Sequence, residues 1–368
     1  MKIVYTRSST IYDDSRASKE ISAFLEAGYK VIVLGWDRNK LAVEKCKELF
    51  KEYNNSIKFR FYSGNEGKNK INKILSRINW NKWLKKQLYA IKNIDIIHSC
   101  DYDTGAVVRK FALKKHIKYV YDIFDYYIDA HPVPAFMRDI IEKDEIRTIN
   151  DSEATIICTE ERREQIKKSS PKKVLVIHNS PEVEEIEPCV EIYDYVYCGS
   201  LFGGRLIKEI LDFYPKNSDL KFVFAGYGEF AEYAQKLDTR YDNFTFLGSI
   251  PYSEVLDIEQ QAKVISAIYE PTIRNHQLCA PNKFYEALAL GKPVIACKGT
   301  GIDKIVEKNR IGISIDYSAE NFYDALRNLL NDENERKKIR IIARNVYDKK
   351  YKWSLMKKQL LGAYKDYI

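Results

Sequence analysis

The residue types best suited to ligand chemistry gather between Tyr269 and Cys297 (YEPTIRNHQLCAPNKFYEALALGKPVIAC). A polar loop there runs into a stretch with apolar residues at helical spacing, which predicts a helix capped by Asn282 and ended by Gly291. The start of a helix offers unpaired N–H groups and the positive end of a dipole, which suit a phosphate. Glu286 lies one turn further on, where a carboxylate can accept hydrogen bonds from both hydroxyls of a ribose. The segment therefore predicts a nucleotide-sized site, and a plain strand–loop–helix connection is the alternative.

A second candidate for phosphate binding is the glycine-rich segment Tyr197–Ile207 (YCGSLFGGRLI). Gly203 and Gly204 allow the backbone to approach a ligand closely. Arg205 follows them directly and can make a bidentate contact with a phosphate. The alternative is a glycine-rich turn that carries a surface arginine.

The elements that must hold these segments are predicted from apolar runs that alternate with helical patterns along the chain. Such alternation predicts parallel sheets covered by helices on both faces, which bind ligands at the carboxyl ends of their strands. We therefore expect an α/β protein with two Rossmann-like domains facing a cleft. The predicted strands are Lys2–Thr6, Lys30–Leu34, Ile57–Phe61, Asp95–His98, Lys118–Asp122, Ala154–Cys158, Val174–Ile177, Tyr195–Cys198, Lys221–Ala225, Phe244–Leu247, Val264–Ile268 and Pro293–Cys297.

A chain of 368 residues is expected to divide into two domains. The segment Ser180–Ile192 (SPEVEEIEPCVEI) has two prolines and five glutamates and breaks the alternation. We therefore predict a first domain at 1–180, a linker at 181–192, a second domain at 193–348 and a C-terminal helix at 349–368.

Composition limits the partners and the compartment. The net charge of +8 is moderate, so charge alone does not choose among phosphates, anionic lipid and nucleic acid. Seven scattered cysteines without a C-x-x-C pair argue for a reducing compartment and against a disulfide framework or a zinc site. The N-terminus does not read as a signal peptide, and no apolar run approaches the roughly 20 residues that span a bilayer. We expect a cytoplasmic protein, at most peripheral on the inner face of the membrane.

The segment from Lys68 to Lys92 (KNKINKILSRINWNKWLKKQLYAIK) has eight lysines or arginines and no acid. Its isoleucine, leucine and tryptophan residues would form an apolar face on a helix. A basic helix with tryptophan beside its polar face suits an anionic membrane surface. The alternative is a helix that faces the core and exposes a solvated basic side. We do not expect nucleic-acid binding, because the segment lacks a recognised module.

Residues 281–296, PNKFYEALALGKPVIA, resemble the donor-site segment of retaining glycosyltransferases with the GT-B fold, the family-4-like group (glycosyl transferases group 1). Glu286 matches the second Glu of that family's Glu-x7-Glu motif, which grips the ribose. Leu278 stands where the first Glu would be, the residue that contacts the donor sugar in the family. Backbone amides of the loop His276–Ala280 are expected to substitute for it.

The glycine-rich segment resembles the family's Gly-Arg-Leu-x-x-x-Lys pattern, whose Arg and Lys hold the donor diphosphate. Gly199 is retained, Ser200 stands at the Arg position and Arg205 at the Lys position, and Lys283 is expected to supply the missing cation. FAGYG at 224–228, FLGSIP at 246–251 and GTGIDKIV at 299–306 match further family segments in the same order. The resemblance implies a donor site formed by Glu286, Asn282, Gly199, Ser200, Gly204, Gly226, Tyr227, Gly228, Leu278, Cys279 and Ala280.

The first half resembles the acceptor side of the family less closely. DIIHSCDYDTGAVV at 95–108 and KYVYDIFDYYIDAH at 118–131 look like its strand-then-loop segments, with Phe124 where many relatives have a histidine. Asp125 is expected to orient the acceptor hydroxyl, and a capping or surface carboxylate is the alternative. The other residues expected on the acceptor side are Arg7, Arg16, Asp101, Asp122 and His131. The last helix, near Trp353, is expected to pack back on the first domain, as it does in the family.

The resemblance implies a retaining hexosyltransferase of polysaccharide or glycoconjugate biosynthesis. It would take a sugar from a UDP- or GDP-linked donor to a glycan or lipid-linked acceptor, with Arg205 and Lys283 stabilising the leaving diphosphate and Asp125 serving the acceptor. No cofactor and no metal are expected. The alternatives are a degenerate GT-B protein that binds a nucleotide sugar or partners an active transferase, and a nucleotide-sugar 2-epimerase. A dehydrogenase is disfavoured because no G-x-G-x-x-G follows the first strand.

Overall fold

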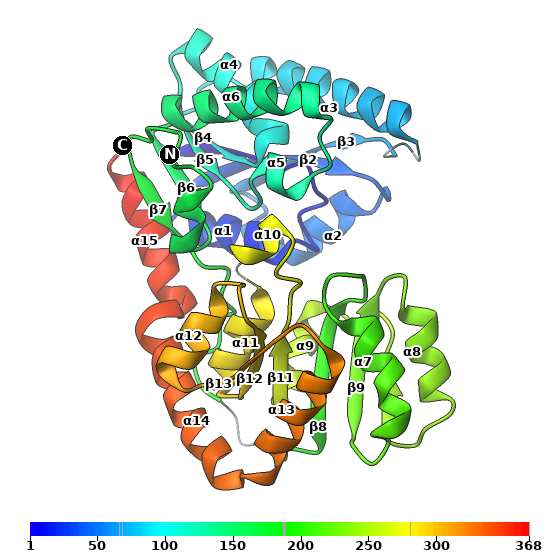
Figure 1. The fold of residues 1–368 in the computed structure, drawn as a ribbon. Helices are drawn as coiled ribbons and strands as arrows, with labels where there is room; N and C mark the ends of the chain where they lie inside the picture. Colours follow the sequence, from blue (N-terminus) through cyan, green and yellow to red (C-terminus); the bar gives the residue numbers. More distant parts are fainter. Residues whose placement is uncertain (66, 68, 187–188, 280, 368) are drawn as a thin grey trace. The chain divides into compact units, whose positions relative to one another are not determined.

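The computed structural model describes residues 1–65, 67, 69–186, 189–279 and 281–367. The chain divides into two compact units: the first comprises Met1–Ile177 with Met356–Ile368, and the second comprises His178–Leu355. Each unit contains a parallel β-sheet with helices packed against it (Figure 1), which confirms the predicted α/β class.

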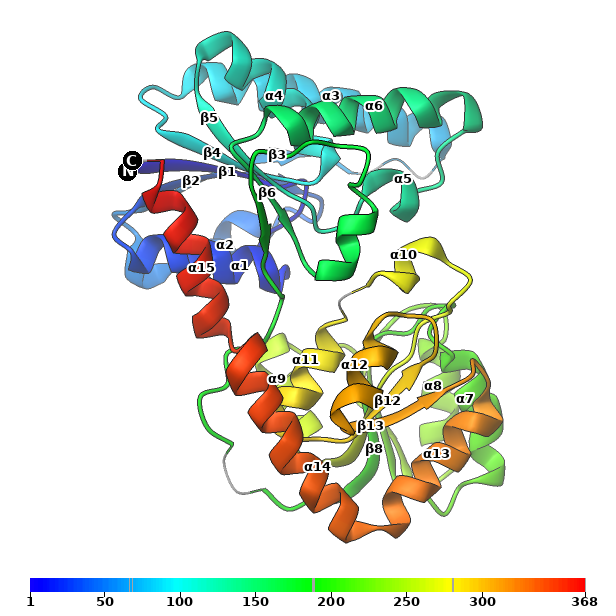
Figure 2. The same cartoon turned by 60° about the vertical axis from the view of Figure 1, so that its left-hand side comes forward.

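The first unit has a seven-stranded sheet in the order β3-β2-β1-β4-β5-β6-β7. Helices α3, α4 and α6 lie on one face of this sheet, and α1 and α2 lie on the other (Figures 1 and 2). The strands are β1 (Lys2–Thr6), β2 (Lys30–Asp37), β3 (Ile57–Ser63), β4 (Ile96–Cys100), β5 (Lys118–Asp122), β6 (Ala154–Ile157) and β7 (Val174–Val176). The α-helices are α1 (Ser15–Glu26), α2 (Ala42–Leu49), α3 (Lys70–Ala90), α4 (Tyr102–Lys115), α5 (Tyr127–Ala130) and α6 (Ala135–Asp151).

The second unit has a six-stranded sheet in the order β10-β9-β8-β11-β12-β13. Its strands are β8 (Tyr193–Ser200), β9 (Phe222–Tyr227), β10 (Phe244–Phe246), β11 (Ala262–Ala267), β12 (Val294–Cys297) and β13 (Gly312–Ile315). Its α-helices are α7 (Ile207–Phe213), α8 (Ala231–Asp238), α9 (Tyr252–Gln260), α10 (Arg274–Gln277), α11 (Asn282–Leu290), α12 (Ile302–Asn309), α13 (Ala319–Asn331) and α14 (Glu333–Val346).

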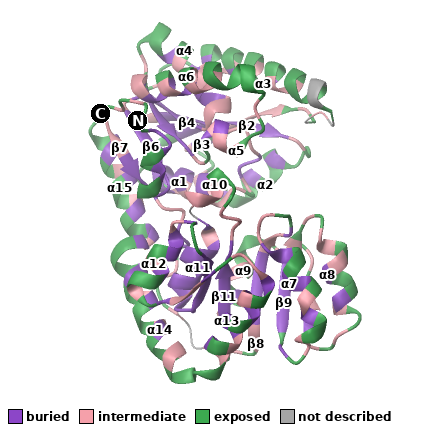
Figure 3. Cartoon of the chain, in the orientation of Figure 1, coloured by how far each residue is buried: buried purple, intermediate pink, exposed green. Residues whose placement is uncertain are grey.

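Burial explains why these runs form strands. The strands are mostly buried and the outer faces of the helices are exposed (Figure 3). Sheets buried on both faces need nearly continuous apolar runs, which is the pattern that predicted the strands. Every predicted strand overlaps a strand of the structure, and among the described strands β13 is the one that was missed. That strand has four residues and begins with a glycine, so its sequence gives little periodic signal.

The last helix is α15 (Trp353–Lys365), which follows a π-helical turn at Tyr347–Tyr351 and begins four residues after the predicted start at 349. The residues from Met356 onward belong to the first unit. The first unit otherwise ends at Ile177, three residues before the predicted boundary at 180. Residues 178–186 and 189–192 form no helix or strand, whereas residues 187 and 188 of the predicted linker lie outside the described chain.

Helix α3 covers most of the basic segment, and its two halves differ. Trp80, Leu84 and Leu88 are buried in the core, as the core-facing interpretation predicts. Ile74 and Leu75, nearer the start of the helix, are 60% and 51% exposed. Lys68 lies outside the described residues. Among the described helices, none combines the length and the apolar character needed to cross a bilayer.

Candidate functional site

Helix α11 begins at Asn282 and is preceded by Pro281 in an extended conformation. Asn282 was predicted to cap this helix, and that prediction is wrong. Pro281 occupies the cap position, so Asn282 is already helical, and its side-chain oxygen instead accepts a hydrogen bond of 2.8 Å from the Asn179 amide. Gly291 ends the helix in the left-handed conformation, as predicted. The first turn of α11 is therefore fixed by a proline before it and by Asn179 beside it.

The ammonium of Lys283, the second residue of α11, lies against the end of β8. Its Nζ is 3.4 Å from Glu259 Oε1 and 4.7 Å from the centroid of the Tyr197 ring. A Cβ atom on Gly199 would come within 3.3 Å of the same Nζ. The lack of a side chain at Gly199 therefore leaves the room that the lysine occupies, and the lysine lies beside the predicted phosphate-binding turn.

Two carboxylates share the environment of Lys283. Glu259 on α9 is 0% exposed and Glu286 on α11 is 2% exposed. Burial, with Glu286 nearby, raises the pKa of Glu259 to about 8 although Lys283 opposes the rise. Burial alone would lower the pKa of Lys283, but the two carboxylates raise it above its ordinary value. Burial and a hydrogen bond to Glu286 raise the pKa of Tyr252. Glu286 therefore lies buried beside Glu259, and Tyr252, which is 41% exposed, borders the pair. Glu259 and Tyr252 were not singled out from the sequence.

The glycines after β8 and β9 are required by close packing of the backbone. A Cβ atom on Gly226 would lie 1.7 Å from the carbonyl oxygen of Gly199. One on Gly228 would lie 2.3 Å from the carbonyl oxygen of Leu201. Both glycines have φ +145°, which side chains rarely adopt. Tyr227 between them is 63% exposed, so the turn presents an aromatic ring to its surroundings.

The double glycine meets the loop that follows β11. The carbonyl oxygen of Gly204 accepts a hydrogen bond of 2.9 Å from the Glu270 N–H, and Gly204 adopts φ +77°. The guanidinium carbon of Arg205 lies 5.4 Å from the centroid of the Tyr269 ring. The N–H of Gly203 donates to Glu229 at 2.8 Å. Glu270 was missed by the sequence analysis, although an acid directly after a predicted strand is a signal for a residue at the ligand-binding edge.

The loop between α10 and α11 contains the predicted substitutes for the missing glutamate. The backbone N–H groups of Leu278 and Cys279 both point to the carbonyl oxygen of His276. Ala280 lies outside the described residues. The imidazole of His276 packs edge-on against Tyr269, with ring centroids 5.2 Å apart. Because His276 and Arg205 both contact Tyr269, this loop lies beside Arg205. Leu278 has no carboxylate, and the nearby Glu270 has one.

In the first unit, Phe124 lies between two guanidinium groups at the carboxyl edge of the sheet. The Cζ atoms of Arg7 and Arg16 are 3.9 and 4.4 Å from its ring centroid. The backbone N–H groups of Phe124 and Asp125 donate to Asp101 Oδ1 at 2.8 and 3.1 Å. Arg7 also pairs with Asp101. Asp101 therefore holds this loop in place, although its side chain does not cap α4.

The side chain of Asp125 is partly exposed to solvent. Its side chain is 50% exposed and pairs with Arg162 at 3.1 Å. His131 is exposed and packs against Tyr127, with ring centroids 4.6 Å apart. These two residues could therefore reach a ligand at this edge, and Arg162 was not singled out from the sequence.

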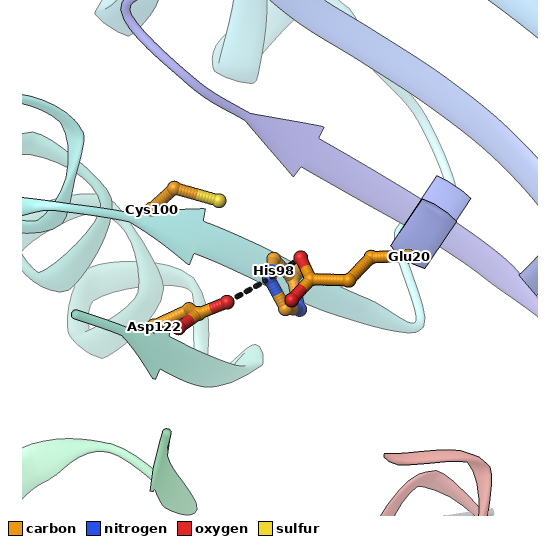
Figure 4. A group of neighbouring side chains, drawn as sticks. All are labelled: Glu20, His98, Cys100 and Asp122. Carbon is orange, nitrogen blue, oxygen red and sulfur yellow. Dashed lines mark ion pairs between the residues drawn. The ribbon is translucent and has the colours of Figure 1, made fainter. Parts of the chain in front are cut away.

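Arg16 and Asp122 were predicted to face an acceptor, but the structure buries both. Arg16 is 3% exposed and Asp122 is 0% exposed, and the two pair with each other. His98 Nε2 lies 3.3 Å from oxygens of both Asp122 and Glu20 (Figure 4), and its Nδ1 contacts the Tyr364 hydroxyl. The acceptor-side prediction for Arg16 and Asp122 is corrected accordingly: they belong to an internal ion-pair network.

Ligand atoms from Glu20, His98, Cys100 and Asp122 lie within 4.8 Å of one another, a grouping suited by type to a metal ion. The sequence analysis expected no metal site. The guanidinium of Arg16 already lies between the two carboxylates, with Nε 3.1 Å from Glu20 Oε1. A further cation would be repelled by that guanidinium in a site without solvent, so we assign the group to the ion-pair network.

The pKa values of the network follow from its charges. Burial alone would raise the pKa of Glu20, but His98 and Arg16 lower it well below its usual range. Burial, with Glu20 nearby, raises the pKa of Asp122 to about 7 against the opposing effect of Arg16. Burial alone would lower the pKa of His98, but the groups around it, including Tyr364 and Asp122, raise it well above its ordinary value.

The donor-side predictions thus converge on one edge of the second unit, where Gly199, Gly204, Arg205, Lys283 and Glu286 lie near one another. Two shallow cavities, of about 270 and 210 Å³, lie elsewhere in the units and are lined by none of the predicted site residues.

Residues 193–346 match the family described as glycosyl transferases group 1. HepE of Anabaena, solved in complex with UDP and glucose, is 14% identical over all of both chains, with a TM-score of 0.71. Sucrose-phosphate synthase of Thermosynechococcus elongatus is 14% identical over all of this chain and 98% of its own, with a TM-score of 0.70. A TarM mutant of S. aureus, solved with fondaparinux, α-GlcNAc-glycerol and UDP, is 13% identical over 99% of each chain, with a TM-score of 0.70.

A search of curated proteins finds no match by sequence. The structural likeness confirms the predicted GT-B fold, and the residues that match the family model lie in the second unit.

Proposed function

We propose that this chain is a glycosyltransferase that takes its sugar from a nucleotide diphosphate, with UDP as the first nucleotide to test. The observation that carries the proposal is the convergence, within the segment that matches the family, of a glycine turn with Arg205 and the start of α11 with Lys283. Two cations and a helix N-terminus beside a backbone without side chains form a suitable seat for a diphosphate. Several solved neighbours hold UDP, which favours uridine.

The proposed chemistry is electrostatic. Negative charge develops on the diphosphate as the bond to the sugar breaks, so fixed positive groups lower the barrier. Arg205 and Lys283 are the cations placed to meet this charge. Glu286 is proposed to bind the ribose hydroxyls, and Glu270, beside Gly204, is proposed to contact the sugar in place of the acid missing at Leu278.

We further propose transfer of a hexose with retention of configuration, because the donor segments resemble those of retaining enzymes. Asp125 is the residue proposed to orient the acceptor hydroxyl, supported by its half-exposed carboxylate at the carboxyl edge of the first sheet. The anomeric configuration of the product, read from the coupling constant of its anomeric proton, tests retention. An inverted product would exclude it.

The acceptor is proposed to be a lipid-linked or membrane-bound glycan, because the first unit exposes an apolar and basic surface. This surface, which we call the α3–α6 patch, comprises exposed side chains of α3 and of the first turns of α6, the two helices that flank α4. Its apolar side chains are Ile74 (60% exposed), Leu75 (51%), Ile78 (43%), Phe136 (80%), Met137 (40%) and Ile140 (66%). Exposed lysines at 73, 82, 85 and 86 surround the apolar part of α3. Apolar side chains with lysines nearby suit an anionic lipid surface.

The place of the patch in the fold supports this occupant. Both helices return the chain from the carboxyl end of a parallel strand, so their first turns lie near the carboxyl edge of the sheet. Figures 1 and 2 show the starts of α3 and α6 at the same end of the helical layer. Asp125 follows β5 at this edge. A lipid surface on the patch would therefore hold its headgroups near the proposed acceptor residue. The described residues form no disulfide, which fits the inner face of a membrane.

Thermal unfolding with UDP, GDP and ADP, followed by incubation with the matching nucleotide sugars, tests the function. A ligand that binds only the folded state raises the melting temperature by mass action. We expect stabilisation by UDP and release of UDP from a UDP-sugar. Stabilisation without release or transfer would favour a degenerate binding protein, and interconversion of sugar 2-epimers would favour an epimerase.

A further inference from the structure

We propose that Glu259 is a positioning residue that holds Lys283 for the donor diphosphate and takes up a proton when the diphosphate binds. The inference rests on the proposed function, because it assumes a diphosphate at the turn after β8. It adds a residue to the site from a helix, α9, that lies outside every segment from which the donor site was inferred.

The first support is an imbalance of buried charge. Glu259, Glu286 and Lys283 are 0%, 2% and 8% exposed. The pairing distance of 3.4 Å joins Lys283 to Glu259, and among the described residues neither carboxylate has another ion-pair partner. Two buried carboxylates thus share one ammonium. Desolvation makes an uncompensated buried charge costly, so one carboxyl group gains by holding a proton.

The second support is the state of the Glu259 carboxyl group itself. Its Oε2 atom is buried without a hydrogen-bond partner in the described part of the chain. A bare carboxylate oxygen in that position lacks both water and a donor, whereas a protonated oxygen carries no charge to compensate. The raised pKa of Glu259, about 8, agrees with this geometry.

The groups that face Glu259 come from two elements besides its own helix. Lys283 and Glu286 approach from α11, Tyr197 and Cys198 from β8, and Tyr252 from the start of α9. Among these groups, Lys283 is the cation. Its ammonium also borders the space above Gly199, where we place the diphosphate.

A diphosphate at this turn shifts the protonation equilibrium of Glu259 toward the protonated form. It adds negative charge near Glu259 and draws the Lys283 ammonium toward the phosphate oxygens. Both effects favour the protonated form of Glu259, so its pKa rises further on binding. Diphosphate binding is therefore linked to proton uptake at pH values above the pKa of Glu259 in the free protein. The affinity for the diphosphate falls as pH rises through that range.

Calorimetric titration of UDP into the full chain tests this linkage. At about pH 8.8 the heat of binding is measured in two buffers of different ionisation enthalpy, which gives the number of protons taken up. The second pKa of a terminal phosphate lies near 6, so the diphosphate does not titrate in this range. The uracil N3–H begins to ionise at alkaline pH, and its contribution is the proton uptake measured with Glu259→Gln. We compare the wild type with Glu259→Gln, and use Glu254→Gln, an exposed glutamate on the same helix, as the matched control.

We expect the wild type and Glu254→Gln to take up close to one proton per UDP more than Glu259→Gln, whose smaller uptake comes from the uracil ring. From pH 7.5 to 8.8 the affinity of the wild type should fall about fivefold, whereas that of Glu259→Gln should change little. UDP binding by the wild type without proton uptake would overturn the inference, and this outcome is measured on the wild type alone. Equal uptake by Glu259→Gln would also overturn it. Absence of UDP binding by all three proteins would instead overturn the proposed function.

Discussion

Gly226 packs so closely against Gly199 that the Cα hydrogen facing the Gly199 carbonyl oxygen leaves no room for a side chain. A Cβ atom would lie 1.7 Å from that oxygen. The two residues are also register partners in β8 and β9. The close contact fixes the end of β8, where the proposed diphosphate turn begins.

The first prediction is that Gly226→Ala lowers stability and abolishes UDP binding. We expect a loss of about 3 kcal/mol or more, since neither the contact nor φ +145° can be kept. Gly28→Ala is the matched control, because Gly28 has φ +79°, no atom within 4 Å of its Cβ position and a place in the first unit, away from this turn. It should cost about 1 kcal/mol and leave binding intact. Melting curves and UDP titration measure both; normal UDP binding by Gly226→Ala would refute the assignment of this turn.

The second prediction concerns the ribose. Glu286→Gln should weaken UDP binding about tenfold, because a neutral amide accepts weaker hydrogen bonds from hydroxyls than a carboxylate does. It should also lose the preference for UDP over 2′-deoxy-UDP that the wild type shows. Competition titration with the two nucleotides measures this, with the exposed Glu254→Gln as control. If Glu286→Gln keeps the preference for UDP over 2′-deoxy-UDP, Glu286 does not bind the ribose hydroxyls.

The third prediction concerns the buried network of the first unit. Because the pKa of His98 is raised in the folded state, its contribution to stability is complete below about pH 6.5 and is lost as pH rises through the folded value. The melting temperature of the wild type should therefore exceed that of His98→Gln most at about pH 6 and by less at pH 9 to 10. A difference that stays constant or grows with pH would show that His98 is neutral in the folded protein.

The fourth prediction concerns membranes. The wild type should sediment with vesicles that contain anionic phosphatidylglycerol and not with neutral phosphatidylcholine vesicles, and added salt should weaken the binding. Ile74→Glu and Phe136→Glu should reduce binding about tenfold or more. Leu113→Glu is the control, because Leu113 is 50% exposed near the end of α4, away from the carboxyl edge of the sheet. If all three variants bind alike, the α3–α6 patch is not the docking surface.

The sequence predicted the sheets well because strands buried on both faces need apolar runs, which stand out between helical patterns. It placed Asn282 at a helix cap because asparagine favours caps, yet the proline before it took that position. Arg16 and Asp122 were expected to face an acceptor because their segments resemble the acceptor side of the family, whereas the fold brings them together across 106 positions.

Glu259 was missed for the same physical reason. Nothing in the pattern of α9 marks one glutamate among its polar residues, and its role depends on Lys283, which lies 24 positions away. Glu270 escaped notice because the resemblance placed the first acid at a fixed distance from Glu286. The structure places Glu270 beside Gly204, and the loop that joins Glu270 to α11 is longer than the spacing in the family motif.

The central claim is that Arg205, beside the double glycine, meets the donor diphosphate. The most direct measurement is UDP affinity and UDP-sugar turnover of Arg205→Ala, compared with Arg240→Ala, whose guanidinium also lies 5.4 Å from a tyrosine ring, that of Tyr241. We expect Arg205→Ala to weaken UDP binding about tenfold or more and to slow turnover by about two to three orders of magnitude, while Arg240→Ala behaves as the wild type. Equal affinity and turnover in the two variants, with both folded, would contradict the account.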